Sequence, residues 1–174
     1  MFKLKVLVHS YLIIFVLLFS TNSTAMEKEY MLKAGFLYNF ARFGQWQTPP
    51  NETYSICSPD KNFIGIANEV LKNRTVQQLP LQSLHVDLNQ ISLKPCNIIF
   101  ITSDTITDWK MSQINNYHNI MIVGESAEFI KSGGHIRFFL SSGKVRFEID
   151  PKKLKDAGIT MSSKVLRLAR VVDR

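Results

Sequence analysis

Residues 27–46 are predicted to form a helix that is apolar on nearly all of its sides. Between Tyr30 and Phe43 the clearly polar positions are Lys33, Asn39 and Arg42. A helix on the surface of a domain shows a narrower apolar stripe than this. The segment is therefore expected either to lie against a sheet and a further element, or to present one face to a partner.

Short apolar runs separated by helical segments follow. Residues 98–101 and 120–123 are continuous apolar runs, which are typical of strands covered on both faces. Residues 80–95 fit no single pattern. The other elements expected here are a strand at 53–57, a helix from Asn62 to Asn73 capped by Asp60, a weak strand at 74–79, a helix from Thr105 or Asp108 to near His118, and a short helix at 126–131.

The C-terminal third changes to strict alternation. Ile136, Phe138 and Leu140, and later Val145, Phe147 and Ile149, alternate with other residues around Ser141-Ser142-Gly143, which predicts a β-hairpin. A short helix capped by Asp150-Pro151 and closed by Gly158 should follow. A last helix, capped by Thr160 or Ser162, should place Val165, Leu168, Ala169 and Val172 on one face. Together these patterns predict a single α/β domain whose mixed sheet combines parallel core strands with a C-terminal antiparallel hairpin, flanked by helices.

The N-terminus has the features of a secretory signal peptide. Lys3 and Lys5 precede an apolar stretch, and the small residues Ser23 and Ala25 stand where a signal peptidase requires them. The apolar stretch, 6–19, is shorter than the roughly 20 residues that span a bilayer. We therefore expect cleavage after Ala25, with 1–25 as the signal peptide and 26–174 as one domain that works outside the cytoplasm.

Charge narrows the choice of partners. The formal charge of +7 falls to +5 when Lys3 and Lys5 leave with the signal peptide. The basic residues are scattered except for Lys152, Lys153 and Lys155, so a solvated cationic face is favoured over a nucleic-acid site. No nucleic-acid partner is expected.

The chain has two cysteines, Cys57 and Cys96. An even count in an exported protein favours a disulfide, and two buried free thiols are the alternative. No C-x-x-C redox motif is present, so the pair is interpreted as structural or redox-sensing.

The sequence carries no recognisable catalytic constellation. His85, His118 and His135 lack the spacing of a metal site, and no G-x-S-x-G, H-E-x-x-H or P-loop motif occurs. We expect no enzymatic activity, no metal and no cofactor. Arg146 and Glu148 point to one face of their strand. A cross-strand surface pair is the favoured interpretation of these two residues, and a polar recognition patch is the alternative.

Aromatic side chains concentrate in the first predicted helix and just after it. Core packing is the first interpretation for each of them, and contact with a partner is the second, because aromatic anchors often carry interface energy. The candidate partner-binding residues are Tyr38, Phe43, Trp46, Arg146 and Glu148.

The segment from Glu29 to Trp46 reads E-Y-M-L-K-A-G-F-L-Y-N-F-A-R-F-G-Q-W and resembles the opening motif of the YfiR family of exported proteins. Three later segments fit the same family pattern: C-N-I-I-F-I from Cys96, the hairpin between G-G-H-I at Gly133 and V-R-F-E-I-D ending at Asp150, and A-G-I-T-M-S-S-K-V-L-R-L-A from Ala157. The resemblance covers nearly the whole chain after the signal peptide.

The resemblance implies a periplasmic α/β domain that can form a homodimer. It also implies a function, which is to bind the periplasmic sensor domain of an inner-membrane diguanylate cyclase and restrain it, so that less cyclic di-GMP is made. A sensor kinase is the alternative class of membrane partner. Cys57 and Cys96 match the family's bridged pair, whereas the second cysteine pair of some members is missing from this chain.

Two other functions are alternatives to this one. A periplasmic small-molecule-binding sensor module would use a pocket at the C-terminal ends of the parallel strands, near 102–104 and 124–126. A hydrolase would need a nucleophile and a base close together, which the sequence does not show.

Overall fold

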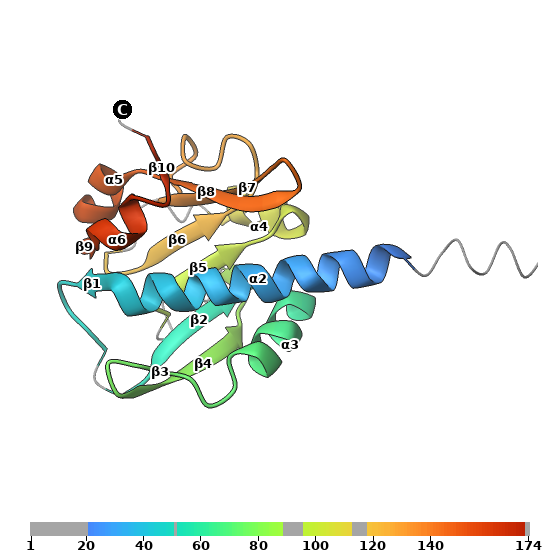
Figure 1. Cartoon of the computed structure of the whole chain (residues 1–174). Coiled ribbons are helices and arrows are strands. Elements are labelled where there is room, and N and C mark those ends of the chain that lie inside the picture. Colours follow the sequence, from blue (N-terminus) through green and yellow to red (C-terminus); the bar gives the residue numbers. More distant parts are fainter. Residues whose placement is uncertain (1–20, 51, 89–95, 113–117, 173–174) are drawn as a thin grey trace, which may run out of the picture.

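The computed structural model describes residues 21–50, 52–88, 96–112 and 118–172 of the chain (Figure 1). The elements in chain order are α2 (Thr21–Phe43), β1 (Gly44–Trp46), β2 (Tyr54–Ser58), α3 (Lys61–Val70), β3 (Thr75–Val76), β4 (Leu79–His85), β5 (Ile98–Ile101), η2 (Ser103–Thr105), α4 (Ile106–Met111), β6 (Met121–Gly124), β7 (Ile136–Ser141), β8 (Lys144–Ile149), α5 (Pro151–Asp156), β9 (Ile159–Met161), α6 (Ser163–Leu166) and β10 (Arg170–Val171).

Within the described residues, the main sheet has eight strands in the order β10-β8-β7-β6-β5-β2-β4-β3. Strands β4, β2, β5, β6 and β7 run parallel to one another, and β8 returns antiparallel to β7. The short strand β10 then adds parallel to β8, and β3 pairs antiparallel with β4. This arrangement confirms the predicted mixed sheet of parallel core strands with a C-terminal hairpin.

Helices α2 and α3 cover one face of this sheet (Figure 1). The side of α2 that faces the sheet is buried and carries Tyr30, Ala34, Leu37 and Ala41, three or four residues apart as one helix face requires. Phe40, also on this side, contacts aromatic rings of the hairpin, with its ring centroid 5.0 Å from that of Phe147. Apolar burial of this kind supplies most of the stability of such a helix.

The opposite face of the sheet carries a smaller apolar cluster and the disulfide. Cys57 in β2 and Cys96, just before β5, form a bond with their Cα atoms 5.9 Å apart and 39 residues apart in sequence. The side chains of Ile99, Trp109 and Phe129 pack in the same cluster. Closing a loop of this length stabilises the fold by about 4 kcal/mol in the chain-entropy model.

The predicted first helix is displaced from its expected bounds. It begins at Thr21 and ends at Phe43, and the next residues form β1, which pairs with β9. A Cβ atom at Gly44 would lie 2.7 Å from the Trp46 ring and 2.8 Å from the Phe40 carbonyl oxygen. Glycine at this position therefore allows the chain to leave the helix in a tight path.

Residues 1–20 of the predicted signal peptide, which spans 1–25, lie outside the described residues. Helix α2 begins at Thr21 and continues across the expected cleavage position after Ala25. None of the helices in the described residues is both long enough and apolar enough to span a bilayer.

The helix predicted at 126–131 is wrong, because these residues form successive turns. The turns place Phe129 against two glycines. A Cβ atom would approach the Phe129 ring to 2.5 Å at Gly124 and to 2.3 Å at Gly134. The segment wraps closely around this ring, and a regular helix does not follow such a path.

The prediction of a last helix that extends to Val172 is also wrong. Ser162 caps α6 as predicted, but α6 ends at Leu166, and Leu168 is 70% exposed. The chain leaves the helix because β8 has an open edge, where Arg170 pairs with Glu148 and Val171 pairs with Ile149. Thr160, the alternative cap, lies in β9.

The structure tests two other expectations only in part, because each reaches into residues that it does not describe. The 80–95 stretch contains most of β4, and its residues 89–95 lie outside the described part. The helix after β5 starts with Thr105 in the N-cap position and ends at Met111. Its expected end near His118 borders residues 113–117, which the structure does not describe.

His135 links β6 to the start of the hairpin. Its Nδ1 atom accepts a hydrogen bond of 3.0 Å from the Ile122 backbone N–H, so the proton of the neutral ring is on Nε2. The side chain is buried. Burial, and then the positive charge of Lys153, lower the pKa of His135 from 6.5 to about 4.

We predict that His135 makes the fold acid-sensitive. Between pH 6.5 and pH 4 the unfolded chain binds a proton that the folded protein does not, so the stabilising contribution present above pH 6.5 is lost as the pH falls. The free energy of unfolding should drop by about 3 kcal/mol from this group. His135→Asn, which keeps an acceptor for the Ile122 N–H, should remove this part of the pH dependence in urea unfolding.

The matched control is His118→Asn, because His118 is exposed. This variant should keep the pH dependence of the wild-type protein. Equal slopes of unfolding free energy against pH for the wild type and His135→Asn would contradict the assignment.

Candidate functional site

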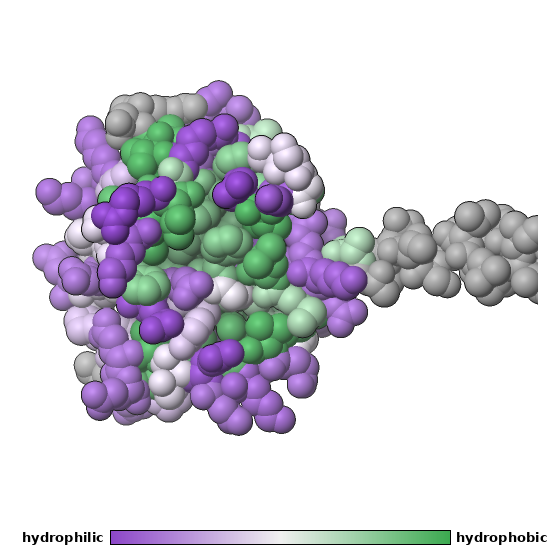
Figure 2. All heavy atoms as spheres, in the orientation of Figure 1, coloured by the Kyte–Doolittle hydropathy of each residue, from purple (hydrophilic) through white to green (hydrophobic). Residues whose placement is uncertain are grey.

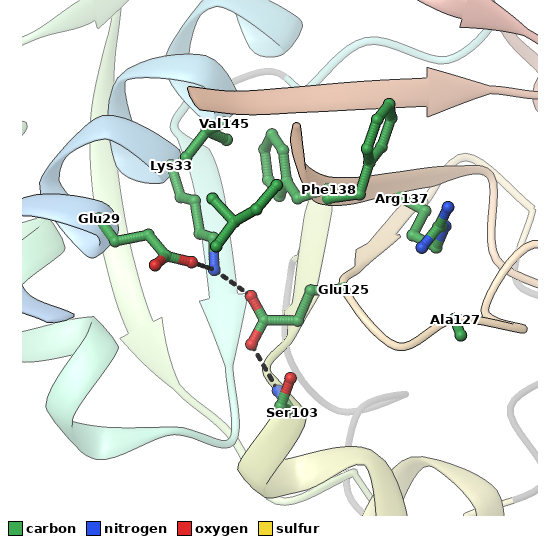
Figure 3. Close-up of a pocket in the computed structure, with 10 residues that line it drawn as sticks. Glu29, Lys33, Ser103, Glu125, Ala127, Arg137, Phe138 and Val145 are labelled. Atoms are coloured by element: carbon green, nitrogen blue, oxygen red, sulfur yellow. Dashed lines mark hydrogen bonds and ion pairs between the residues drawn. The ribbon is translucent and has the colours of Figure 1, made fainter. Parts of the chain in front are cut away.

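A hollow of about 350 Å³ lies beside the C-terminal ends of β5 and β6, which we call the strand-end hollow (Figure 3). Its lining includes Lys33 of α2, Ser103 after β5, Glu125 after β6, and Phe138, Leu140 and Val145 of the hairpin. Ser103 and Glu125 belong to the two segments where the sequence predicted a pocket. The presence of a hollow at this place is therefore confirmed, whereas its occupation by a ligand stays a prediction.

A buried lysine forms the charged side of the strand-end hollow. Lys33 is only 4% exposed. Its ammonium group contacts Glu29 at 2.6 Å and donates a hydrogen bond to Glu125. The second carboxylate oxygen of Glu125 accepts a 2.6 Å hydrogen bond from the Ser103 backbone N–H (Figure 3). Because a buried charge is costly without partners, this network fixes α2 to the ends of two strands.

The other side of the strand-end hollow is apolar, with Phe138, Leu140 and Val145. The combination suits a small molecule that has both an apolar part and a polar group, since a few convergent polar groups on an apolar wall are typical of ligand pockets. Within the residues described here, no group of three or more His, Cys, Asp or Glu residues could hold a metal ion.

Glu148 lies at the centre of a second charged cluster. Its carboxylate accepts hydrogen bonds from Arg137 at 2.6 Å and from Arg170 Nε at 2.9 Å. Burial by itself raises the pKa of Glu148, but the hydrogen bonds and positive charges of the two arginines outweigh it and hold the pKa below its ordinary value. Arg170 also lies over the ring of Phe139, 4.3 Å from its centroid.

The cross-strand interpretation of Glu148 is thus confirmed in its pairing, since Arg137 faces it across the hairpin. Its surface location is wrong, because Glu148 is 9% exposed. The carboxylate holds the C-terminal strand β10 to β8 through Arg170. Arg146 is exposed and faces Phe139 across the hairpin.

The aromatic candidates differ in accessibility. Trp46 is buried and packs edge-to-face on Tyr54, with ring centroids 5.7 Å apart. Tyr38 and Phe43 are half-buried. The guanidinium of Arg42 lies 5.5 Å from each of these two rings.

Burial gives Trp46 and Glu148 roles inside the fold. Tyr38, Phe43 and Arg146 keep accessible surface, so contact with a partner is easier to reconcile with these three. The structure does not bring the five candidates together into one site, and partner binding by each of them stays a prediction.

The sequence interpretation missed the buried ion network of Lys33. The sequence pattern marks Lys33 as a polar exception on an apolar helix and places Glu125 in a predicted pocket segment, but it does not join the two. Two signals could have found the network. The spacing of Glu29 and Lys33 is that of an i,i+4 pair, and Lys33 falls on the same helix side as Tyr30 and Leu37, which face the core.

We predict that Lys33→Met lowers the free energy of unfolding by about 3 kcal/mol, because it leaves Glu125, whose side chain is only 11% exposed, without its cation. The double variant Lys33→Met/Glu125→Gln should lose less than the sum of the two single variants. Chemical denaturation of the four proteins measures this coupling.

Lys131 and Glu128 offer a matched control, as their ion pair is exposed. Lys131→Met should cost less than about 1 kcal/mol. Additive effects of Lys33→Met and Glu125→Gln would show that the buried pair does not couple the helix to the strand ends.

Comparison with known protein families identifies a match over most of the described fold. The family model described as YfiR/HmsC-like matches residues 30–170, which include most of α2 and every later element up to Arg170 of β10. A comparison with curated proteins finds no match. The chain belongs to the YfiR/HmsC-like family.

Proposed function

We propose that the mature chain is a periplasmic regulator that binds the periplasmic domain of an inner-membrane diguanylate cyclase and restrains it, lowering cyclic di-GMP. The observation that carries the proposal is the family match over residues 30–170. The family is periplasmic and regulatory. Membership in it is consistent with a role in regulating diguanylate cyclase signalling. A sensor kinase is the second class of membrane partner that this function allows.

The surface of the domain supports a binding role. Apolar side chains are exposed on α2 and on the hairpin, where Met31 is 45%, Leu32 49% and Leu140 61% exposed. Figure 2 shows apolar areas on both sides of α2 on the face that this helix crosses. Exposed apolar patches rimmed by polar residues are typical of protein-protein interaction sites.

Deleting the gene for this chain should raise cyclic di-GMP, because the cyclase is released from restraint. Supplying the exported chain should restore the lower level. Nucleotide extraction followed by mass spectrometry measures both effects.

The control is the same chain without residues 1–25, which should stay in the cytoplasm and fail to restore the level. Unchanged cyclic di-GMP after deletion, together with membranes that yield neither a cyclase nor a kinase bound to the tagged chain, would refute the proposed function.

A small-molecule sensor role is the second candidate, and the strand-end hollow favours it. We predict that a ligand of this hollow raises the melting temperature of the wild-type protein in a thermal-shift screen of small organic acids and amines. Ala127 is exposed and lines the hollow, so Ala127→Trp should fill the space and abolish the shift. A screen with no stabilising compound, or a shift that Ala127→Trp retains, would count against this role.

A further inference from the structure

An open groove separates the first half of α2 from the tip of the hairpin. We call it the α2–hairpin groove, with a volume of about 640 Å³ and a lining that includes Lys28, Leu32, Leu140, Lys144, Val145 and Arg146. It is distinct from the strand-end hollow, although Glu29, Leu140 and Val145 contribute to both. Because it opens to solvent between two elements, a segment of another protein could enter it.

The α2–hairpin groove has apolar surface that the fold leaves uncovered. Leu32 is 49% exposed and Leu140 is 61% exposed, and they stand on opposite walls. Val145, between them in the lining, is only partly buried. Large apolar side chains facing each other across an open groove lose this exposure when a partner's apolar side chains fill the space.

Three of the four charged residues in the groove lining are basic. Lys28, Lys144 and Arg146 are all exposed. The carboxylate in the lining, Glu29, is already paired with the buried Lys33 at 2.6 Å. Cleavage before Met26, as the sequence predicts, would remove Ala25, which also lines the groove, and would add a free α-amino group at the same end of α2. The groove therefore complements a negatively charged ligand surface.

We propose that the α2–hairpin groove binds an acidic, amphipathic segment of the membrane partner's periplasmic domain. Apolar side chains of this segment contact Leu32, Leu140 and Val145, and its carboxylates pair with Lys28, Lys144 and Arg146. The inference rests on the proposed function and adds the place and the chemistry of the contact.

Two other occupants are outcomes of the tests below. In a two-fold symmetric contact centred on the groove, a second copy of the chain would bring the same basic rim against Lys28, Lys144 and Arg146, and like charges at an interface are repulsive. An anionic lipid surface would satisfy the charges as well, and vesicle binding distinguishes it from a protein segment.

The first test is photocrosslinking in cells that express the exported, full-length chain. A photoreactive amino acid replaces Leu140 in the groove. In a matched protein it replaces Lys155, an exposed residue of α5 outside the groove lining. Position 140 should crosslink to an inner-membrane signalling protein, and position 155 should not.

The second test reverses the charge of the rim. Lys144→Glu/Arg146→Glu should weaken binding to the partner's periplasmic domain about tenfold at low salt, and less at high salt. Lys152→Glu/Lys155→Glu changes the same number of exposed basic residues in α5 and should bind as the wild type does. All four residues are exposed, and unfolding curves check that both double variants remain folded.

The outcomes separate the two proposals. If the wild-type chain and Lys144→Glu/Arg146→Glu bind the partner and lower cyclic di-GMP equally well, this result refutes the proposed binding in the groove and leaves the proposed function intact. Crosslinks from position 140 only to a second copy of the chain would also overturn it. So would binding to vesicles of phosphatidylglycerol and phosphatidylcholine without any protein crosslink. A wild-type chain that binds no signalling protein would end both proposals.

Discussion

The packing of α2 across the sheet is the interaction on which the other features depend. One side of this helix buries Tyr30, Leu37 and Phe40 against the parallel strands and the hairpin. The strand-end hollow and the α2–hairpin groove both have α2 as a wall. Lys33 adds a specific constraint to this apolar contact, because its ion pair with Glu125 fixes the helix relative to the ends of β5 and β6. A shift of α2 would therefore change both cavities together.

Local sequence signals predicted those elements whose formation depends on nearby residues. The strand at 98–101, the hairpin and the caps Asp60, Asp150 and Ser162 all appear as expected, since each rests on a short apolar pattern or on one side-chain hydrogen bond. The early end of the last helix and the missed ion pair depend on contacts distant in sequence.

The end of the chain illustrates the point. Its apolar spacing fits a helix, but β8 offers unpaired backbone groups, and Arg170 reaches the buried carboxylate of Glu148. Neither the open edge nor the burial of Glu148 is visible in the order of residues. The buried Lys33–Glu125 pair was missed for the same reason, because its partners are distant in sequence. The pocket position was predictable, since parallel strands direct their C-terminal ends to one edge.

The disulfide acts on a different part of the molecule from the two cavities. It joins β2 to the start of β5 on the face opposite α2, and the loop that it closes contains α3, β3 and β4. Residues of α2 and of the hairpin lie outside that loop. Reduction would therefore remove a constraint on the unfolded chain, and no residue of that loop lines the α2–hairpin groove. This location favours a structural role for the bond, through which redox conditions would change the amount of folded protein more than its affinity for a partner.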